Sequence, residues 1–322
     1  MNNRLLVGAS LCLGCIVGPL VGTARAQTGD TVPVVKDLKR PVLGPHRFVP
    51  NPVTEDPFPR TFVRNSLGIG TALDLPFTPE IVIGTDTIDA ITGDLIFALL
   101  DFQYSQRIKE WMGFWATIKV RGRLGNDLGS LVAEGVTLST GFNIGWMFKF
   151  LETDRIAMSA TAQVTKGSFT GMNLFGFIQG VIDSQPVPLV RKVPTLWVGP
   201  GLRFAWAANT WLGVTANGTL MYGEGADRTQ ASQAFWRMSA AASLDFASLI
   251  HVPVGLVLAA QVASDDPNGE SSNNSTGGLL RIAYTGRDDF VIALDISSLH
   301  TTLFSGTEVD VGATQISMRY YF

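Results

Sequence analysis

The chain has 322 residues, of which 46% are hydrophobic and 16% are charged, and its formal net charge is −3. This charged fraction is well below the roughly 25% typical of soluble globular proteins, and without a basic excess nothing suggests nucleic-acid binding. Beyond residue 26 no stretch has the roughly 18 uninterrupted apolar residues of a spanning helix. The composition therefore argues against both an ordinary soluble protein and a helical membrane protein.

Residues 1–26 have the organisation of a secretory signal peptide. Arg4 supplies the positive start, an apolar run covers residues 5–22, and Ala24-Arg25-Ala26 has the small-x-small form that signal peptidase accepts. Both cysteines of the chain lie in this segment, and the alternatives to an ordinary signal peptide are a membrane anchor and lipid attachment at Cys15. We expect an exported protein whose mature part has no disulfide and no cysteine metal site.

Residues 27–60 form a proline-rich extension. Its prolines are Pro33, Pro41, Pro45, Pro50, Pro52, Pro57 and Pro59. Because proline fixes φ and lacks an amide donor, neither a helix nor a central strand can run through this segment. We expect an extended chain that is either a linker or a segment that docks to a periplasmic partner or threads into a barrel.

From residue 61 onward, apolar and polar residues alternate with a period of two. In the stretch 112–123, for example, one face carries Phe114, Ala116, Ile118 and Val120, and the other carries Trp115, Thr117, Lys119, Arg121 and Arg123. This alternation predicts strands that lie between two different environments. Several of the segments exceed the five or six residues usual in globular sheets, whereas a tilted membrane strand needs about 9–11 residues plus its extensions.

Twelve such segments follow one another along the chain. They cover about 61–73, 95–107, 112–123, 135–150, 156–169, 195–207, 211–223, 233–246, 252–264, 276–285, 289–299 and 308–322. Short and long connections alternate between them, as in outer-membrane barrels with short periplasmic turns and long outer loops. We therefore predict an all-β fold, a transmembrane antiparallel β-barrel of about 12 strands over residues 61–322, preceded by the proline-rich N-terminal extension.

The chain ends in Ile316-Ser317-Met318-Arg319-Tyr320-Tyr321-Phe322, with apolar or aromatic residues at alternate positions. This ending resembles the carboxy-terminal signature of Gram-negative outer-membrane β-barrel (porin-like) proteins and points to no particular subfamily. The resemblance implies location in the cell outer membrane, contact with its lipid, and recognition of Tyr320 and Phe322 by the barrel-assembly machinery. Aromatic girdles are expected at both membrane interfaces, with Tyr222, Phe235 and Trp236 near the outer one.

The less apolar face of each strand is expected to point inward, because a charge on the lipid face costs about 2–4 kcal/mol at the membrane midplane. The inward acidic residues are then Asp101, Asp245 and Asp295. The inward basic residues are Arg64, Arg107, Lys119, Arg121, Arg123, Lys149, Arg203, Arg237, Arg281 and Arg319. These charges form either an ion-pair network that fills a closed barrel or the positive wall of a passage that favours anions. The excess of cations favours the passage.

The function we expect is that of a passive channel for small anionic solutes. The alternative is a non-conducting structural or docking barrel that anchors an envelope assembly through residues 27–60. Enzymatic activity is not expected, because His46, His251 and His300 have no suitably placed nucleophile in the sequence, and no metal or cofactor site is indicated. The apolar loop 170–194 either folds inward as a constriction or packs over the outer rim.

Overall fold

The structure is a computed structural model that describes residues 40–76, 81–83, 86–88, 92–124, 135–172, 190–224, 233–264, 274–302 and 308–322. The predicted signal peptide, residues 27–39 and residues 173–189 of the apolar loop lie outside these ranges. The described residues belong to one compact unit, Asp37–Phe322.

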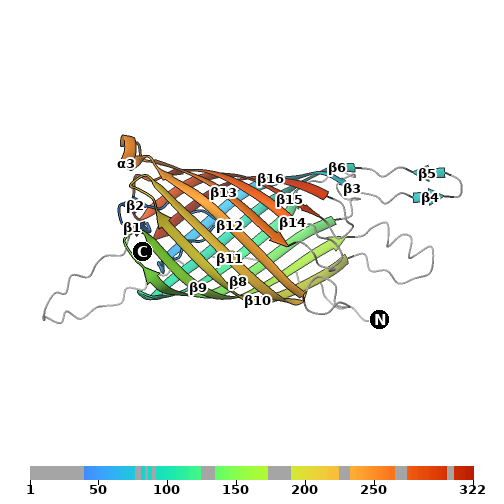
Figure 1. The fold of residues 1–322 in the computed structure, drawn as a ribbon. Helices are drawn as coiled ribbons and strands as arrows, with labels where there is room; N and C mark the ends of the chain where they lie inside the picture. Colours follow the sequence, from blue (N-terminus) through green and yellow to red (C-terminus); the bar gives the residue numbers. More distant parts are fainter. Residues whose placement is uncertain are drawn as a thin grey trace, which may run out of the picture. The chain divides into compact units, whose positions relative to one another are not determined.

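Twelve antiparallel strands form a closed barrel, as predicted (Figure 1). The strands are β3 (Phe62–Pro76), β6 (Thr92–Lys109), β7 (Met112–Leu124), β8 (Gly135–Glu152), β9 (Ile156–Met172), β10 (Val190–Ala207), β11 (Leu212–Glu224), β12 (Gln233–Asp245), β13 (Val254–Ser264), β14 (Asn274–Tyr284), β15 (Phe290–Thr302) and β16 (Glu308–Tyr321). Each strand pairs with its neighbours in sequence, and β16 pairs with β3 to close the ring. Closure leaves no sheet edge, which is the condition for a sheet to span a bilayer.

The strand bounds match the sequence pattern closely at the short turns and extend beyond it at the opposite end. β10, for example, begins at Val190 rather than near residue 195. Antiparallel pairing forms backbone hydrogen bonds whatever the side chains are. A strand can therefore continue past the point where the alternation of apolar and polar residues stops. A small hairpin of β4 (Ile81–Ile83) and β5 (Asp86–Ile88), which the pattern did not predict, lies between β3 and β6.

The connections 110–111, 153–155, 208–211, 246–253 and 285–289 lie at one end of the barrel, which we call the short-turn end. The carboxy terminus and the helical turn α3 (Ala247–Ile250) lie at this end (Figure 1). The connection 246–253 is longer than predicted because it contains α3 and Pro253, which cannot donate a ladder hydrogen bond. Among the described residues no helix is long and apolar enough to cross a bilayer.

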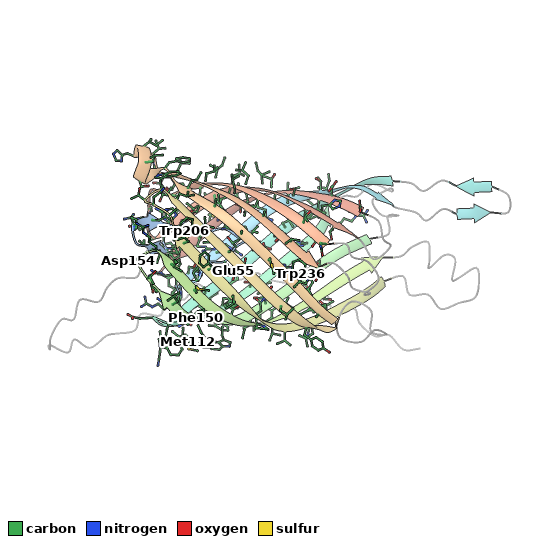
Figure 2. The ribbon with its side chains drawn as sticks, viewed as in Figure 1. Glu55, Met112, Phe150, Asp154, Trp206 and Trp236 are labelled. Carbon is green, nitrogen blue, oxygen red and sulfur yellow. The ribbon has the colours of Figure 1, made fainter. Side chains whose placement is uncertain are left out.

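The two faces of the barrel wall differ as the alternation predicted. On β3, Leu67 is 65% exposed on the outer face, whereas Arg64 and Ser66 on the inner face are buried. Large apolar side chains extend outward along the wall, and the exposed aromatic residues Phe150 and Trp206 lie toward the short-turn end (Figure 2). This apolar outer face and polar inner face are the signature of an outer-membrane barrel.

One residue of the predicted outer girdle is placed differently. Phe235 shares the inner face of β12 with Arg237, whose guanidinium lies 5.4 Å from its ring centroid, and it contacts Trp197. The period-two alternation of β12 requires this, because Trp236 takes the outward position between them.

Candidate functional site in the barrel lumen

Residues 40–61, which we call the insert, lie inside the barrel in its half nearer the short turns. The insert starts as a two-stranded hairpin of β1 (Val42–Leu43) and β2 (His46–Arg47), then continues to β3 without regular secondary structure. The sequence left open whether the extension is a linker, docks to a partner or threads into the barrel. Its described part threads into the barrel.

Apolar side chains of the insert pack against two parts of the wall. Leu43, Phe48 and Phe58 are buried against small residues of β9 and β10, namely Ala157, Ala205 and Ala207. On the other side, Val49 joins a cluster with Phe62, Ala241, Val257, Ala259, Leu279, Ala283, Val291, Ala293 and Tyr321. Burial of each large side chain contributes roughly 1.5–3 kcal/mol, so the insert is held firmly at these points.

Two glycines of the wall make room for the insert. A Cβ on Gly213 would lie 2.4 Å from a ring carbon of His46, and one on Gly255 would lie 2.4 Å from a methyl carbon of Val49. Such distances are not tolerated, so only glycine permits this close approach. These two inward glycines therefore accommodate the insert rather than widen a passage at this level.

The wall also supplies hydrogen bonds to the backbone of the insert. An extended, proline-rich chain leaves its carbonyl oxygens without sheet partners, and buried carbonyls need a donor. The contacts are Ser159 Oγ to Pro57 O (2.6 Å), Ser239 Oγ to Val53 O (3.1 Å), and Val49 N to Ser243 Oγ (2.9 Å). The serines on the inner face thus act as backbone partners of the insert.

At the short-turn end, two arginines of the insert form ion pairs with the wall and its turns. Arg40 is buried, with Nη1 3.2 Å from Asp245 Oδ2 and Nη2 donating to Thr285 O at 3.1 Å. Arg47 pairs with Asp288 at 2.5 Å, but its side chain is largely exposed. The exposed Arg47–Asp288 pair should add little to the stability of the folded state, because exposed ion pairs contribute only about 0–1 kcal/mol. The buried Arg40–Asp245 pair should matter more.

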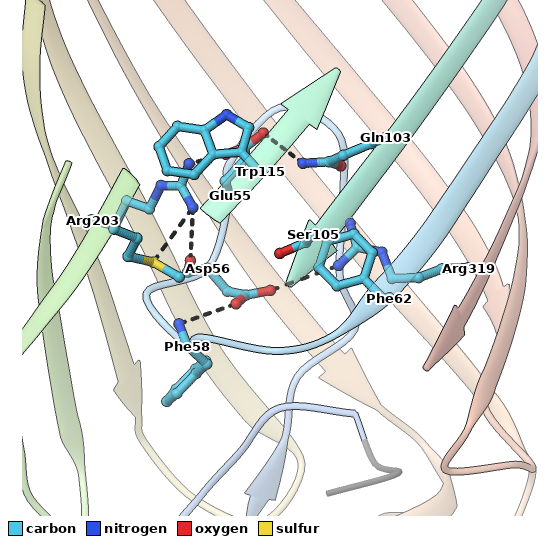
Figure 3. Close-up of a pocket in the computed structure, with 10 residues that line it drawn as sticks. Glu55, Asp56, Phe58, Phe62, Gln103, Ser105, Trp115, Arg203 and Arg319 are labelled. Carbon is cyan, nitrogen blue, oxygen red and sulfur yellow. Dashed lines mark hydrogen bonds and ion pairs between the residues drawn. The ribbon is translucent and has the colours of Figure 1, made fainter. Parts of the chain in front are cut away.

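Deeper in the lumen, two adjacent carboxylates of the insert reach opposite walls (Figure 3). Glu55 pairs with Arg203 of β10 and accepts a hydrogen bond from Gln103 at 3.3 Å. Asp56 Oδ2 lies 3.8 Å from Arg319 Nη1 of β16. Five strands separate β10 from β16 in either direction around the ring, so Glu55 and Asp56 bridge diametrically opposed strands.

Both of these arginines also rest on aromatic rings of the wall. The guanidinium of Arg203 lies 4.2 Å from the ring centroid of Trp115, and that of Arg319 lies 4.2 Å from the ring centroid of Phe62. Trp115 is itself oriented by a hydrogen bond from Nε1 to Asn143 Oδ1 at 2.6 Å. These cation–π contacts belong to the barrel and position the two charges independently of the insert.

A cavity of about 20 Å³ lies among Glu55, Asp56, Arg203 and Arg319. A volume of this size accommodates a water molecule and no larger solute. In this structure the insert therefore leaves no room for a solute between its two carboxylates and the two arginines.

The other predicted lumen residues also lie on the inner face, in different settings. Arg281 is buried and forms a bidentate pair with Asp295 at 2.6 and 2.7 Å, with a further hydrogen bond to Ser317. Lys149 pairs with Glu152 near the rim. Lys119 lies opposite Asp101 in the β6–β7 register, and beyond it the same face of β7 carries Arg121, which is exposed, and Arg123.

Sequence reasoning missed Arg40, Glu55 and Asp56 as lumen residues. The three acidic and ten basic residues predicted to point inward all belong to the strands of residues 61–322. Counter-ions of Arg203 and Arg319 from residues 27–60 were therefore not considered. One available signal was the presence of Phe48, Val49 and Phe58 in a segment considered as a linker. Solvated linkers contain few aromatic and β-branched apolar residues, because such side chains would be exposed to water.

His46 has an unusual setting at the base of the insert. Its Nδ1 donates to Thr210 O at 3.3 Å, and its buried Nε2 has no hydrogen-bond partner. Burial lowers the pKa of His46 below its usual value, although the Thr210 carbonyl and Asp245 act in the opposite direction. His46 is therefore neutral at pH 7. Among the described residues no group of three or more His, Cys, Asp and Glu side chains is arranged to hold a metal.

No protein-family model matches the chain, and no curated protein matches it. Among solved structures it is similar to the KdgM porin (7% identity, TM-score 0.43, 80% of this chain and 99% of that one). It is also similar to the NanC porin (10% identity, TM-score 0.46, 81% of this chain and 100% of that one). A further similar structure is the translocator domain of the autotransporter NalP from Neisseria meningitidis (9% identity, TM-score 0.46, 81% of this chain and 88% of that one). The fold assignment rests on the chain's own closed sheet, whose apolar outer face and charged inner face give it the architecture of an outer-membrane β-barrel.

Proposed function

We propose that this protein is an outer-membrane channel through which small anionic solutes diffuse passively. The observation that carries the proposal is the row of Lys119, Arg121 and Arg123 on the inner face of β7, nearer the long loops than the insert. Inside a low-dielectric wall, such a row lowers the barrier for anions and raises it for cations. Salt weakens this effect, because the Debye length is about 10 Å at 0.1 M ionic strength.

We expect the insert to shift when solutes pass, because it packs against two parts of the wall inside the lumen near the short turns. The purified protein in planar bilayers should therefore show infrequent openings whose reversal potential in a salt gradient indicates anion preference. Gly213→Val should raise the conductance, since its side chain would clash with His46 and Phe48 and loosen the insert. A non-selective or cation-selective current would contradict the anionic part of the proposal.

A non-conducting docking barrel is the second candidate, and the packing of the insert inside the lumen favours it. In that case the insert is a permanent plug, and residues 27–39 would hold a periplasmic partner. Protease accessibility of residues 40–60 shows whether Gly213→Val has released the insert. If the insert is released and no current appears, the docking barrel is the better assignment.

The proposal includes export and assembly but no catalytic step. The signal peptide is removed after residue 26, and the barrel-assembly machinery recognises Tyr320 and Phe322 before the barrel enters the lipid. Two contacts support a role for this end of the chain: the Tyr320 and Phe322 rings stack with centroids 6.1 Å apart, and Phe322 N donates to Thr61 O at 3.2 Å. The last residue is thus tied to the start of the first barrel strand.

A further inference from the structure

The arginines of the lumen fall into two classes according to the source of their counter-ions. Arg281 is neutralised by Asp295, which belongs to the barrel wall. The ion pairs described for Arg203 and Arg319 are instead with Glu55 and Asp56 of the insert. Arg203 is 8% exposed and Arg319 is 5% exposed, so both charges are buried beside the insert.

The insert carboxylates can leave without disturbing the two arginines. Trp115 and Phe62 hold the guanidinium groups from the wall. The apolar anchors Val49 and Phe58 lie on either side of the Glu55–Asp56 pair. Displacement therefore requires the chain between these anchors to move and to give up its hydrogen bonds to Thr215 and Ser239. Two buried arginines without counter-ions would then face the lumen from opposite walls, which is a strong site for an anion.

We propose that Arg203 and Arg319 form the solute-binding site of the lumen, that the solute class is small organic anions carrying carboxylates, and that Glu55 and Asp56 occupy this site as built-in ligands. The inference rests on the proposed channel function. It adds the place in the lumen where the solute binds, the class of solute, and the carboxylates that occupy this place when no solute is bound. A free carboxylate can form the same charge-assisted hydrogen bonds with arginine as a tethered one. A tethered group acts at an effective concentration on the order of millimolar, so a solute at about 10 mM competes with it.

The test measures exposure of the insert by the labelling rate of a buried reporter. Thr54 is buried between the anchors and hydrogen-bonds to Thr215 Oγ1 at 2.8 Å. Thr54→Cys, with Cys12 and Cys15 replaced by Ser, should react slowly with a soluble maleimide. Heat-modifiable mobility on gels verifies that each variant is a folded barrel.

Glu55→Gln with Asp56→Asn should raise the labelling rate at least about tenfold, because two buried charge pairs are lost. The matched control is Arg47→Gln with Asp288→Asn, which removes an exposed pair between the same insert and the rim and should change the rate less than about twofold. A wild-type rate in the Glu55/Asp56 variant overturns the proposal.

Succinate at about 10 mM should raise the labelling rate of the parent reporter more than sodium chloride of equal ionic strength. Arg203→Gln with Arg319→Gln should label quickly and lose the response to succinate. Equal effects of succinate and sodium chloride in the parent would mean simple screening and would overturn the proposal.

The two proposals fail in different ways. Anion-selective current with no effect of Glu55→Gln, Asp56→Asn or succinate on labelling leaves the channel standing and overturns the binding site. Labelling that responds as expected in a protein that never conducts supports the binding site and overturns the channel.

Discussion

The two ends of the lumen treat arginine differently. Near the short turns, Arg203, Arg281 and Arg319 are buried and paired, whereas Arg121, nearer the long loops, is exposed on the same inner surface. The same residue type thus forms buried ion pairs at one end and is exposed in the lumen at the other. A count of inward charges therefore does not predict selectivity until the partner of each charge is known.

The largest effect should follow from damage to the short-turn end, where the ring closes. Deletion of Phe322 removes the proposed assembly signal, the stacking on Tyr320 and the backbone hydrogen bond to Thr61, whereas Phe322→Ser removes the first two. Because an open sheet edge is intolerable in lipid, we expect little protein in the outer membrane and degradation of the remainder. Membrane fractionation with heat-modifiable mobility measures this, and normal levels would contradict it.

Next should come loss of a buried pair at this end. Arg281→Ala leaves Asp295 buried without its partner, which should lower the free energy of unfolding by about 3–5 kcal/mol. Arg121→Ala at the long-loop end should change it by less than about 0.5 kcal/mol. Urea unfolding in detergent compares the two variants, and equal losses would remove the distinction between the two ends.

The long-loop end should respond in selectivity rather than stability. Replacement of Lys119, Arg121 and Arg123 by Glu should reverse or strongly weaken anion preference, most visibly at low ionic strength. The barrel should still assemble, since the substitutions lie on the inner face. An unchanged reversal potential in planar bilayers would show that these side chains have a structural role instead.

The smallest effect should come from pH at the base of the insert. The pKa of His46 is lowered by burial, so the folded state disfavours its charged form, and the stabilisation is complete above the unfolded pKa near 6.5. It is lost progressively as the pH falls from 6.5 toward the folded pKa. Labelling of Thr54→Cys should therefore rise modestly between pH 7 and 5, and His46→Gln should abolish this change.

The sequence by itself determined the barrel. Alternation is a local property that each strand displays independently, so the strand count, the inward face and most short turns were readable from residues 61–322. The inner placement of Arg281 and Asp295 was predictable in the same way, and their pairing follows from adjacent strands.

Only the tertiary structure decided what fills the lumen. Glu55 contacts Arg203 across 148 positions of sequence. Its neighbour Asp56 contacts Arg319 on the opposite wall, because ring closure places β16 opposite β10. No periodicity encodes such a contact, since it depends on the path of a proline-rich chain that has no repeating pattern. The physical reason is that side-chain alternation reports the environment of each face, whereas the partner of a buried charge depends on the closed ring and the chain that threads it.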